Sequence, residues 1–242
     1  QAAGLLPAEA SALPRVMEIA DRAVDRVAVR YEEELAPAIP RVWRSEVEQI
    51  RIDVRGWILE SVPSQRDWQP AHFEWAFGLR EEDSAEEAVI LDGVRLRGRI
   101  DLIERNRTGG ALRVTDHKTG KAPERPPVWI GGGEVLQPVL YALAAEKLLG
   151  APVESGSLFY ATQRGRYTRH QIALDQGARA RAAHTLGLIN QAIVEGFLPA
   201  APRRDACQYC DYTMVCGPYE ERRVNKKRQD ELASLAALRN IP

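Results

Sequence analysis

Two aspartates and a lysine lie at a spacing that suits phosphodiester chemistry. Asp101 and Asp116 flank a turn-forming stretch, and Lys118 follows two residues after Asp116. If the two halves pair as a hairpin centred on Thr108 and Gly109, opposed residue numbers sum to 217. The two aspartates then face each other with Cβ atoms about 5 Å apart. Strand alternation places Lys118 on the same face.

This arrangement predicts a metal-assisted hydrolysis. Two close carboxylates repel each other unless a cation neutralises them. Mg²⁺ or Mn²⁺ suits carboxylate oxygens and keeps positions open for water and a phosphate. A nearby ammonium can hold the attacking water or stabilise developing negative charge. A solvated cross-strand charge cluster would show the same spacing, so the spacing alone leaves both interpretations open.

A phosphate-binding loop is a competing interpretation of Thr119, Gly120 and Lys121. The pattern G-x-x-x-x-G-K-[ST] requires glycine at position 115 and a hydroxyl residue after the lysine. Thr115 and Ala122 occupy those positions. We therefore expect no ATP site here.

The three cysteines form a compact C-x2-C-x5-C cluster at Cys207, Cys210 and Cys216. An odd count within ten residues is a poor disulfide framework and indicates a reducing, cytoplasmic compartment. Thiolates at this density favour Zn²⁺ or an iron–sulfur cluster. A closed zinc site needs a fourth ligand, and His170 and His184 are candidates at unhelpful sequence distances.

Composition excludes several classes of protein. The chain has 242 residues, of which 45% are hydrophobic and 28% charged, so neither disorder nor a fibre is expected. No apolar stretch is long enough for a membrane span. The net charge of −1 requires any nucleic-acid site to be a local patch. The chain begins without Met or a secretory signal, so we expect a domain cut from a longer protein.

Apolar spacing predicts helices at both ends of the chain and strands between them. This order favours an α+β or α/β core with helical additions. We expect one domain over 1–242, divided into a helical region, a catalytic core and a cysteine-bearing end at 1–70, 71–175 and 176–242. The predicted helices are 14–35, 41–62, 134–150, a helix capped by Asp175 and ending near Gly196, and 221–240. The predicted strands are 72–78, 88–105 with a turn at Asp92 and Gly93, 111–118, 156–163 and 166–174, and an acidic loop is expected at 81–87.

Three motifs in order, GRIDLIE, TDHKTGK and LQPVLY, resemble the nuclease domain of the RecB/AddB-like branch of the PD-(D/E)XK superfamily. That family has a G-x-I-D segment with a metal-binding aspartate, then an acidic-x-Lys segment, then a Q-x-x-x-Y motif. The glutamine and tyrosine share a helix face, so both could point at the scissile strand. The matched positions are Asp101, Asp116, His117 (through its main-chain carbonyl), Lys118, Gln137 and Tyr141.

The resemblance covers roughly 41–217 and implies a restriction-endonuclease-like fold, a mixed central sheet flanked by helices. It implies a Mg²⁺- or Mn²⁺-dependent exonuclease acting on single-stranded DNA beside a helicase subunit or domain, in DNA repair and recombination, with no membrane association. Three alternatives stay open. The chain could bind DNA without cutting it, serve as an iron–sulfur scaffold, or belong with the CRISPR-associated exonucleases.

Two ligands that the family usually has are absent from this sequence. One is a histidine in an early helix, since His72 lies beside a strand pattern instead. The other is a fourth cysteine from before the core, which joins three later ones around a 4Fe–4S cluster. The resemblance implies that Cys207, Cys210 and Cys216 hold this cluster with a fourth cysteine outside this chain. Glu74 matches an acidic position in the family's first strand.

Overall fold

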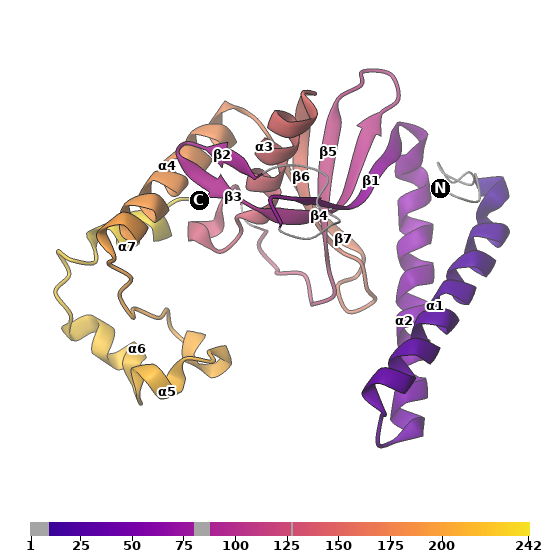
Figure 1. Cartoon of the computed structure of the whole chain (residues 1–242), viewed down its shortest axis with the longest axis horizontal. Coiled ribbons are helices and arrows are strands. Elements are labelled where there is room, and N and C mark those ends of the chain that lie inside the picture. The colour runs from indigo at the N-terminus through magenta and orange to yellow at the C-terminus, as the bar shows by residue number, and fades with distance from the viewer. Residues whose placement is uncertain (1–9, 80–87, 127) are drawn as a thin grey trace.

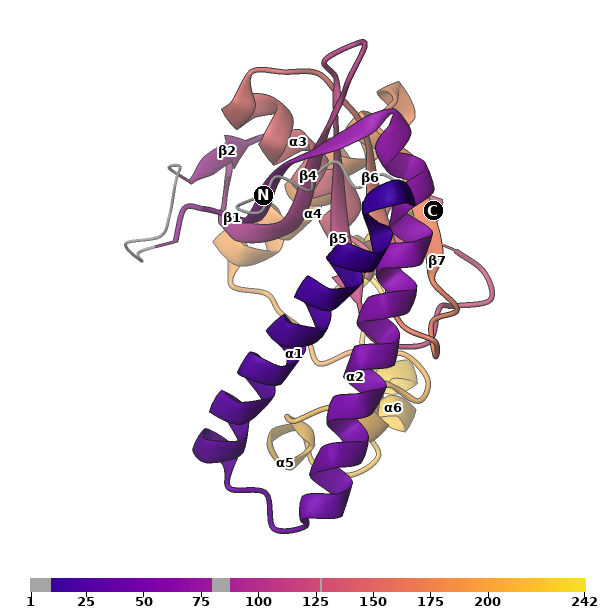
Figure 2. The same ribbon diagram turned by 90° about the vertical axis from the view of Figure 1, so that its right-hand side faces the viewer.

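The computed structural model describes residues 10–79, 88–126 and 128–242, so the acidic loop expected at 81–87 lies outside the described residues. The predicted N-terminal helices are confirmed as α1 (Leu13–Leu35) and α2 (Pro40–Ser61). They form a hairpin that projects from one side of the sheet (Figures 1 and 2). In α2 only Ile58 is buried, near the end that meets the sheet.

Five strands form a mixed central sheet in the order β1-β4-β5-β6-β7. Strands β5 and β6 are parallel, and the other neighbours are antiparallel. The predicted turn at Asp92 and Gly93 instead joins a separate two-stranded hairpin, and both residues have positive φ, as this tight turn requires. The strands are β1 (Trp68–Phe77), β2 (Val89–Leu91), β3 (Val94–Leu96), β4 (Gly98–Asn106), β5 (Leu112–Lys118), β6 (Val153–Tyr160) and β7 (Thr168–Ala173).

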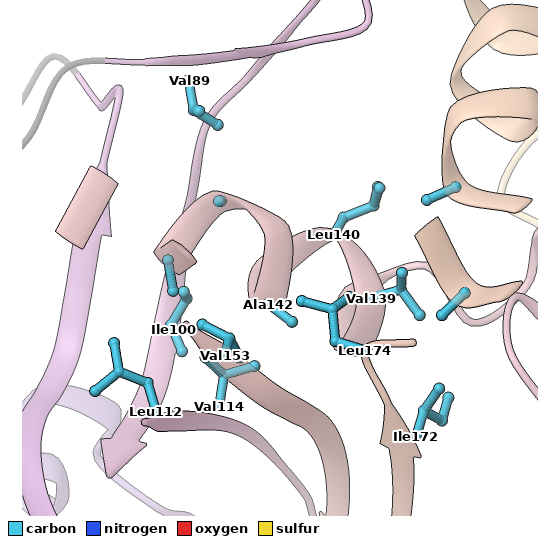
Figure 3. Close-up of a cluster of buried hydrophobic side chains, with 14 of the residues drawn as sticks. Val89, Ile100, Leu112, Val114, Val139, Leu140, Ala142, Val153, Ile172 and Leu174 are labelled. Atoms are coloured by element: carbon cyan, nitrogen blue, oxygen red, sulfur yellow. The ribbon is translucent and has the colours of Figure 1, made fainter. Parts of the chain in front are cut away.

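Helix α3 (Gln137–Leu149) connects the parallel strands β5 and β6 and covers one face of the sheet. Its Val139 and Ala142 pack over Val114 in the hydrophobic core (Figure 3). The first turn of the helix lies directly on β6, because a Cβ built at Gly156 would overlap the Pro138 carbonyl oxygen. This close approach holds the first turn of the helix against the strand.

Substituting Gly156 with alanine is therefore expected to destabilise the protein by about 1–3 kcal/mol or more, because backbone must move to admit the methyl group. Urea denaturation followed by circular dichroism measures the change. Gly187→Ala is a matched control, since nothing lies within 4 Å of its added Cβ in helix α4. The control should gain up to about 1 kcal/mol from helix propensity. Equal stability of the two variants would contradict the close approach.

The C-terminal part begins with α4 (Gln176–Glu195), which starts and ends as predicted. The Asp175 carboxylate accepts the Ala178 amide at 2.7 Å, and Gly196 ends the helix at φ 64°. The cysteine-bearing segment then lies away from the sheet (Figure 1) before the chain returns to pack on α4. The remaining elements are α5 (Thr213–Cys216), α6 (Glu220–Arg223), α7 (Ala233–Arg239) and five 3-10 turns at Ala10–Ala12, Val62–Arg66, Gly131–Gly133, Ala206–Tyr209 and Val224–Lys226.

The single helix predicted over 221–240 is wrong, because this stretch divides into α6, a 3-10 turn and α7. Glu220 is buried, and its carboxylate pairs with Arg223 and, at 2.6 Å, with Lys227. Lys227 itself is extended, with ψ 157°. Arg223 and Lys227 therefore both pair with the Glu220 carboxylate and do not lie along one face of a continuous helix. In the described ranges every helix is too short or too polar to cross a bilayer.

Candidate active site

The ladder between β4 and β5 has the expected register and ends beside the two aspartates. It runs from Arg105 and Leu112 to Leu102 and Thr115, and every pair sums to 217. Asp101 follows next on β4. Its carboxylate Oδ2 accepts the main-chain amide of His117 at 2.6 Å. Beyond the last pair of the ladder, the Asp101 side chain therefore binds the main-chain amide that a strand neighbour would otherwise bind.

Asp116 is buried on the face of β5 that α3 covers. Its Oδ2 lies 2.7 Å from Lys118 Nζ as an ion pair, but this oxygen meets no hydrogen-bond geometry with any group in the described residues. The Lys118 ammonium donates instead to Gln137 Oε1 at 2.7 Å. Gln137 thus holds the lysine in place from the first residue of α3.

The two carboxylates differ in their electrostatics. Burial raises the pKa of Asp116, and the charge of Asp101 raises it further against the lowering effect of Lys118. Burial also acts to raise the pKa of Asp101, but the hydrogen bonds from His117 and the Lys118 charge outweigh it and lower that pKa. Without a cation, Asp101 carries its charge more readily than Asp116.

Tyr141 occupies a different environment from Gln137. Its ring meets Phe77 edge-on at 6.3 Å between centroids. Its Cε1 also lies 3.0 Å from the position a Cβ would take at Gly98, so the glycine of the G-x-I-D segment makes room for the tyrosine. Tyr141 therefore packs against Phe77 and Gly98, whereas Gln137 contacts Lys118.

His117 points to the opposite face from Asp116, toward α2. Its Nε2 accepts the indole N–H of Trp57 at 3.2 Å, and the two rings meet edge-on. Because indole is only a donor, a neutral His117 carries its proton on Nδ1, which lies 3.6 Å from Asp101 Oδ2. Helix α2 therefore contacts the aspartate through the histidine.

A cleft of about 400 Å³ opens beside Asp101, between α2 and the sheet. Glu74 lines it as well, and the β1–β4 register places Glu74 opposite Asp101. Glu74 has φ 49°, a left-handed conformation that is rare and costly for residues other than glycine. Glu74 of β1 therefore lines the same cleft as Asp101.

A family model of the PD-(D/E)XK nuclease superfamily matches residues 2–217. The chain belongs to the PD-(D/E)XK nuclease superfamily. The mixed sheet flanked by helices is the restriction-endonuclease-like fold expected from the motifs, and membership implies a metal-dependent nuclease that binds DNA. A search of curated proteins found no match.

The donors of this PD-(D/E)XK site fit a hard divalent ion. Asp116 Oδ2 is a buried carboxylate oxygen without a hydrogen bond, and Asp101 Oδ2 lies at the end of the ladder. Such oxygens suit Mg²⁺ or Mn²⁺. No three His, Cys, Asp or Glu side chains in the described residues are grouped closely enough to hold an ion. An ion here would therefore also need main-chain oxygen, water or phosphate.

The sequence pattern gives Trp57 no role beyond the predicted helix over 41–62, because it is one of several apolar residues at helical spacing there. Replacing it with phenylalanine keeps an aromatic ring but removes the N–H bond to His117. We expect Mn²⁺ affinity to fall about tenfold, because loss of a residue that hydrogen-bonds a metal-binding residue typically weakens metal affinity by at least this factor. Isothermal titration of the metal-free PD-(D/E)XK domain measures it. Trp43→Phe on the same helix is the control, and equal affinities for the two variants would show that the bond is irrelevant to metal binding.

The cysteines of the PD-(D/E)XK domain line one cavity of about 840 Å³, although they are not grouped closely enough to hold a metal as described. All three are free thiols. Burial and the neighbouring Glu221 carboxylate raise the pKa of Cys207, which favours the thiol over the thiolate. The basic residues around them are partly neutralised, since Arg203 pairs with Glu134 and Arg228 with two acids.

Proposed function

We propose that this PD-(D/E)XK domain is a Mg²⁺- or Mn²⁺-dependent exonuclease for single-stranded DNA within a helicase–nuclease system of DNA repair and recombination. The observation that carries the nuclease assignment is the convergence of Asp101, Asp116 and Lys118 at the end of the β4–β5 ladder. The order of the three motifs supports the single-strand and helicase assignments.

Each residue has a distinct task in the proposed reaction. Asp101, Asp116 and the His117 main-chain carbonyl would hold the ion, which supplies charge neutralisation at the phosphate and a more acidic water. Gln137 orients the Lys118 ammonium, which holds the attacking water and stabilises negative charge on the phosphate oxygens. The low pKa of Asp101 keeps this carboxylate ionised for the task.

Cutting of end-labelled linear and circular single-stranded DNA tests this proposal. Linear single strands should be degraded in Mg²⁺ or Mn²⁺ but not in EDTA, and circular single strands should persist because they have no end. Cutting of circles would replace the exonuclease assignment with an endonuclease. Binding without cutting under every metal condition would favour the non-cleaving DNA-binding module.

We also propose a 4Fe–4S cluster at Cys207, Cys210 and Cys216, completed by a fourth cysteine outside this chain. The support is that the three cysteines of the motif line one cavity. A protein that carries that additional cysteine, purified without oxygen, should contain iron and sulfide. Zinc without iron would refute the iron–sulfur cluster while retaining a metal staple.

A further inference from the structure

The cleft beside Asp101 is lined mainly by apolar side chains, although it opens onto carboxylates. Helix α2 supplies one wall and strand β1 the other, while Asp101 and Glu74 border the same space. The apolar lining residues are Ile50, Val54, Trp57, Phe73, Leu102 and Ala161. An apolar slot bordered by a candidate metal-binding carboxylate suits a ligand that has both a flat apolar part and an anionic part.

Phe73 is the aromatic residue best placed to receive such a ligand. It pairs with Leu102, the residue directly after Asp101, so it stands on the sheet next to the site. The residue is 43% exposed, and Ile50 on the α2 wall is 52% exposed. A planar group entering between the two walls would cover exposed apolar surface that the described structure leaves in water.

Several polar groups that border the cleft already make hydrogen bonds within the protein. The Asp53 carboxylate accepts the main-chain amide of Gln163 at 2.8 Å. The Thr162 hydroxyl donates to the Thr119 carbonyl and accepts the Gly165 amide. Few groups remain to recognise the edges of a ligand by hydrogen bonds. Recognition would therefore depend on stacking of a planar group, and hydrogen bonds that read its edges would contribute little.

We propose that this cleft takes one unpaired nucleobase next to the scissile phosphate, stacked on Phe73. The proposal rests on the proposed nuclease function and deepens it. A base in a duplex would have to leave its partner and the stack to enter the cleft. The cleft therefore selects single strands or frayed ends and shows little sequence preference, as stacking platforms do.

Fluorescence of 2-aminopurine, whose emission falls when it stacks, tests the contact directly. The probe is a single-stranded oligonucleotide with 2-aminopurine at successive positions from its end, titrated with Mg²⁺ and the full chain. The Lys118→Ala background prevents cutting and keeps both carboxylates. We expect quenching at one or two positions, and Phe73→Ala to abolish it and to weaken affinity about 5- to 150-fold, the equivalent of one stacked base.

Matched variants separate stacking from general effects. Phe197→Ala removes a phenylalanine of similar exposure, 40%, in the groove between α4 and α7, and should leave affinity and quenching unchanged. Phe73→Trp should retain quenching. If Phe73→Ala fails to fold, Phe73→Leu keeps an apolar side chain without the flat ring and should lose the quenching.

An abasic nucleotide at the quenched position gives a second readout. It should weaken binding to the Phe73-containing protein but cause no further loss in Phe73→Ala. Equal affinity and quenching with and without the Phe73 ring would overturn the nucleobase site. Stacking without cutting by the unmutated chain would instead refute the nuclease function alone.

Discussion

Cutting of single-stranded DNA should fall about a hundred- to a thousandfold when Asp101→Asn, Asp116→Asn or Lys118→Ala is introduced separately. Each aspartate variant removes a ligand of the ion that would neutralise the phosphate, and Lys118→Ala removes a positive charge beside it. Losses of this size are typical of preorganised charge stabilisation. Initial rates in saturating Mn²⁺ measure the effect. The conserved fold of each variant is checked by its circular dichroism spectrum.

Lys121→Ala is the control for the lysine variant. Lys121 is exposed and lies three residues from Lys118, so it shares the local charge but not the ion pair with Asp116. Its loss should change cutting by less than about threefold at moderate salt, where screening weakens exposed charges. If the two lysine variants cut equally well, the ammonium at 118 is not part of the reaction.

Divalent metal should stabilise the unsubstituted chain much more than Asp116→Asn. An ion that binds only the folded protein adds RT ln(1 + [L]/Kd), about 2.7 kcal/mol at a hundredfold excess over Kd. Removing a buried carboxylate ligand should remove most of that gain. Thermal melts with EDTA and then with Mn²⁺ give the shifts for both proteins.

Without metal, Asp116→Asn should stabilise the folded protein instead of reducing its stability. The pKa of Asp116 is raised above 3.8 in the folded protein, so the folded state binds its proton more readily than the unfolded state. Stability therefore decreases as pH rises from about 3.8 through the raised pKa, and the cost is fully present above it. Asp116→Asn should consequently melt higher than the unsubstituted chain in EDTA at neutral pH, and this advantage should fade at low pH.

Glu154→Gln controls for a general effect of removing an acid, because Glu154 is exposed on β6. It should leave both the metal shift and the pH dependence unchanged. A metal-induced shift in Asp116→Asn as large as in the unsubstituted chain would mean that Asp116 is not a ligand.

The register of the β4–β5 hairpin was predictable because a short turn and two alternating strands determine it. The sum of 217 holds along the β4–β5 ladder. What alternation could not predict is that the ladder ends one pair before the aspartates. Asp101 then binds the His117 amide, and only the three-dimensional course of the strands determines that bond.

Contacts from distant segments were harder to predict than the motifs. Trp57 and His117 are 60 positions apart, and nothing in the apolar stripe of α2 distinguishes Trp57 from a core residue. The Q-x-x-x-Y motif predicts that Gln137 points at the scissile strand, and in the structure its Oε1 accepts a hydrogen bond from Lys118. The prediction of a single helix over 221–240 was wrong because the buried Glu220 carboxylate pairs with basic side chains of this segment. Burial of an acidic residue leaves no periodic pattern in the sequence.

The His117 amide is shielded by a carboxylate rather than by a neighbouring strand. Its exchange with deuterium therefore follows the position of one side chain, whereas the amides within the ladder exchange only when the strands separate. If an ion binds Asp101 Oδ2, this oxygen leaves the His117 amide and the amide exchanges faster. If the ion binds Oδ1, the hydrogen bond remains and the amide stays protected. A single exchange rate in the sheet thus distinguishes the two ways in which Asp101 can take up a metal.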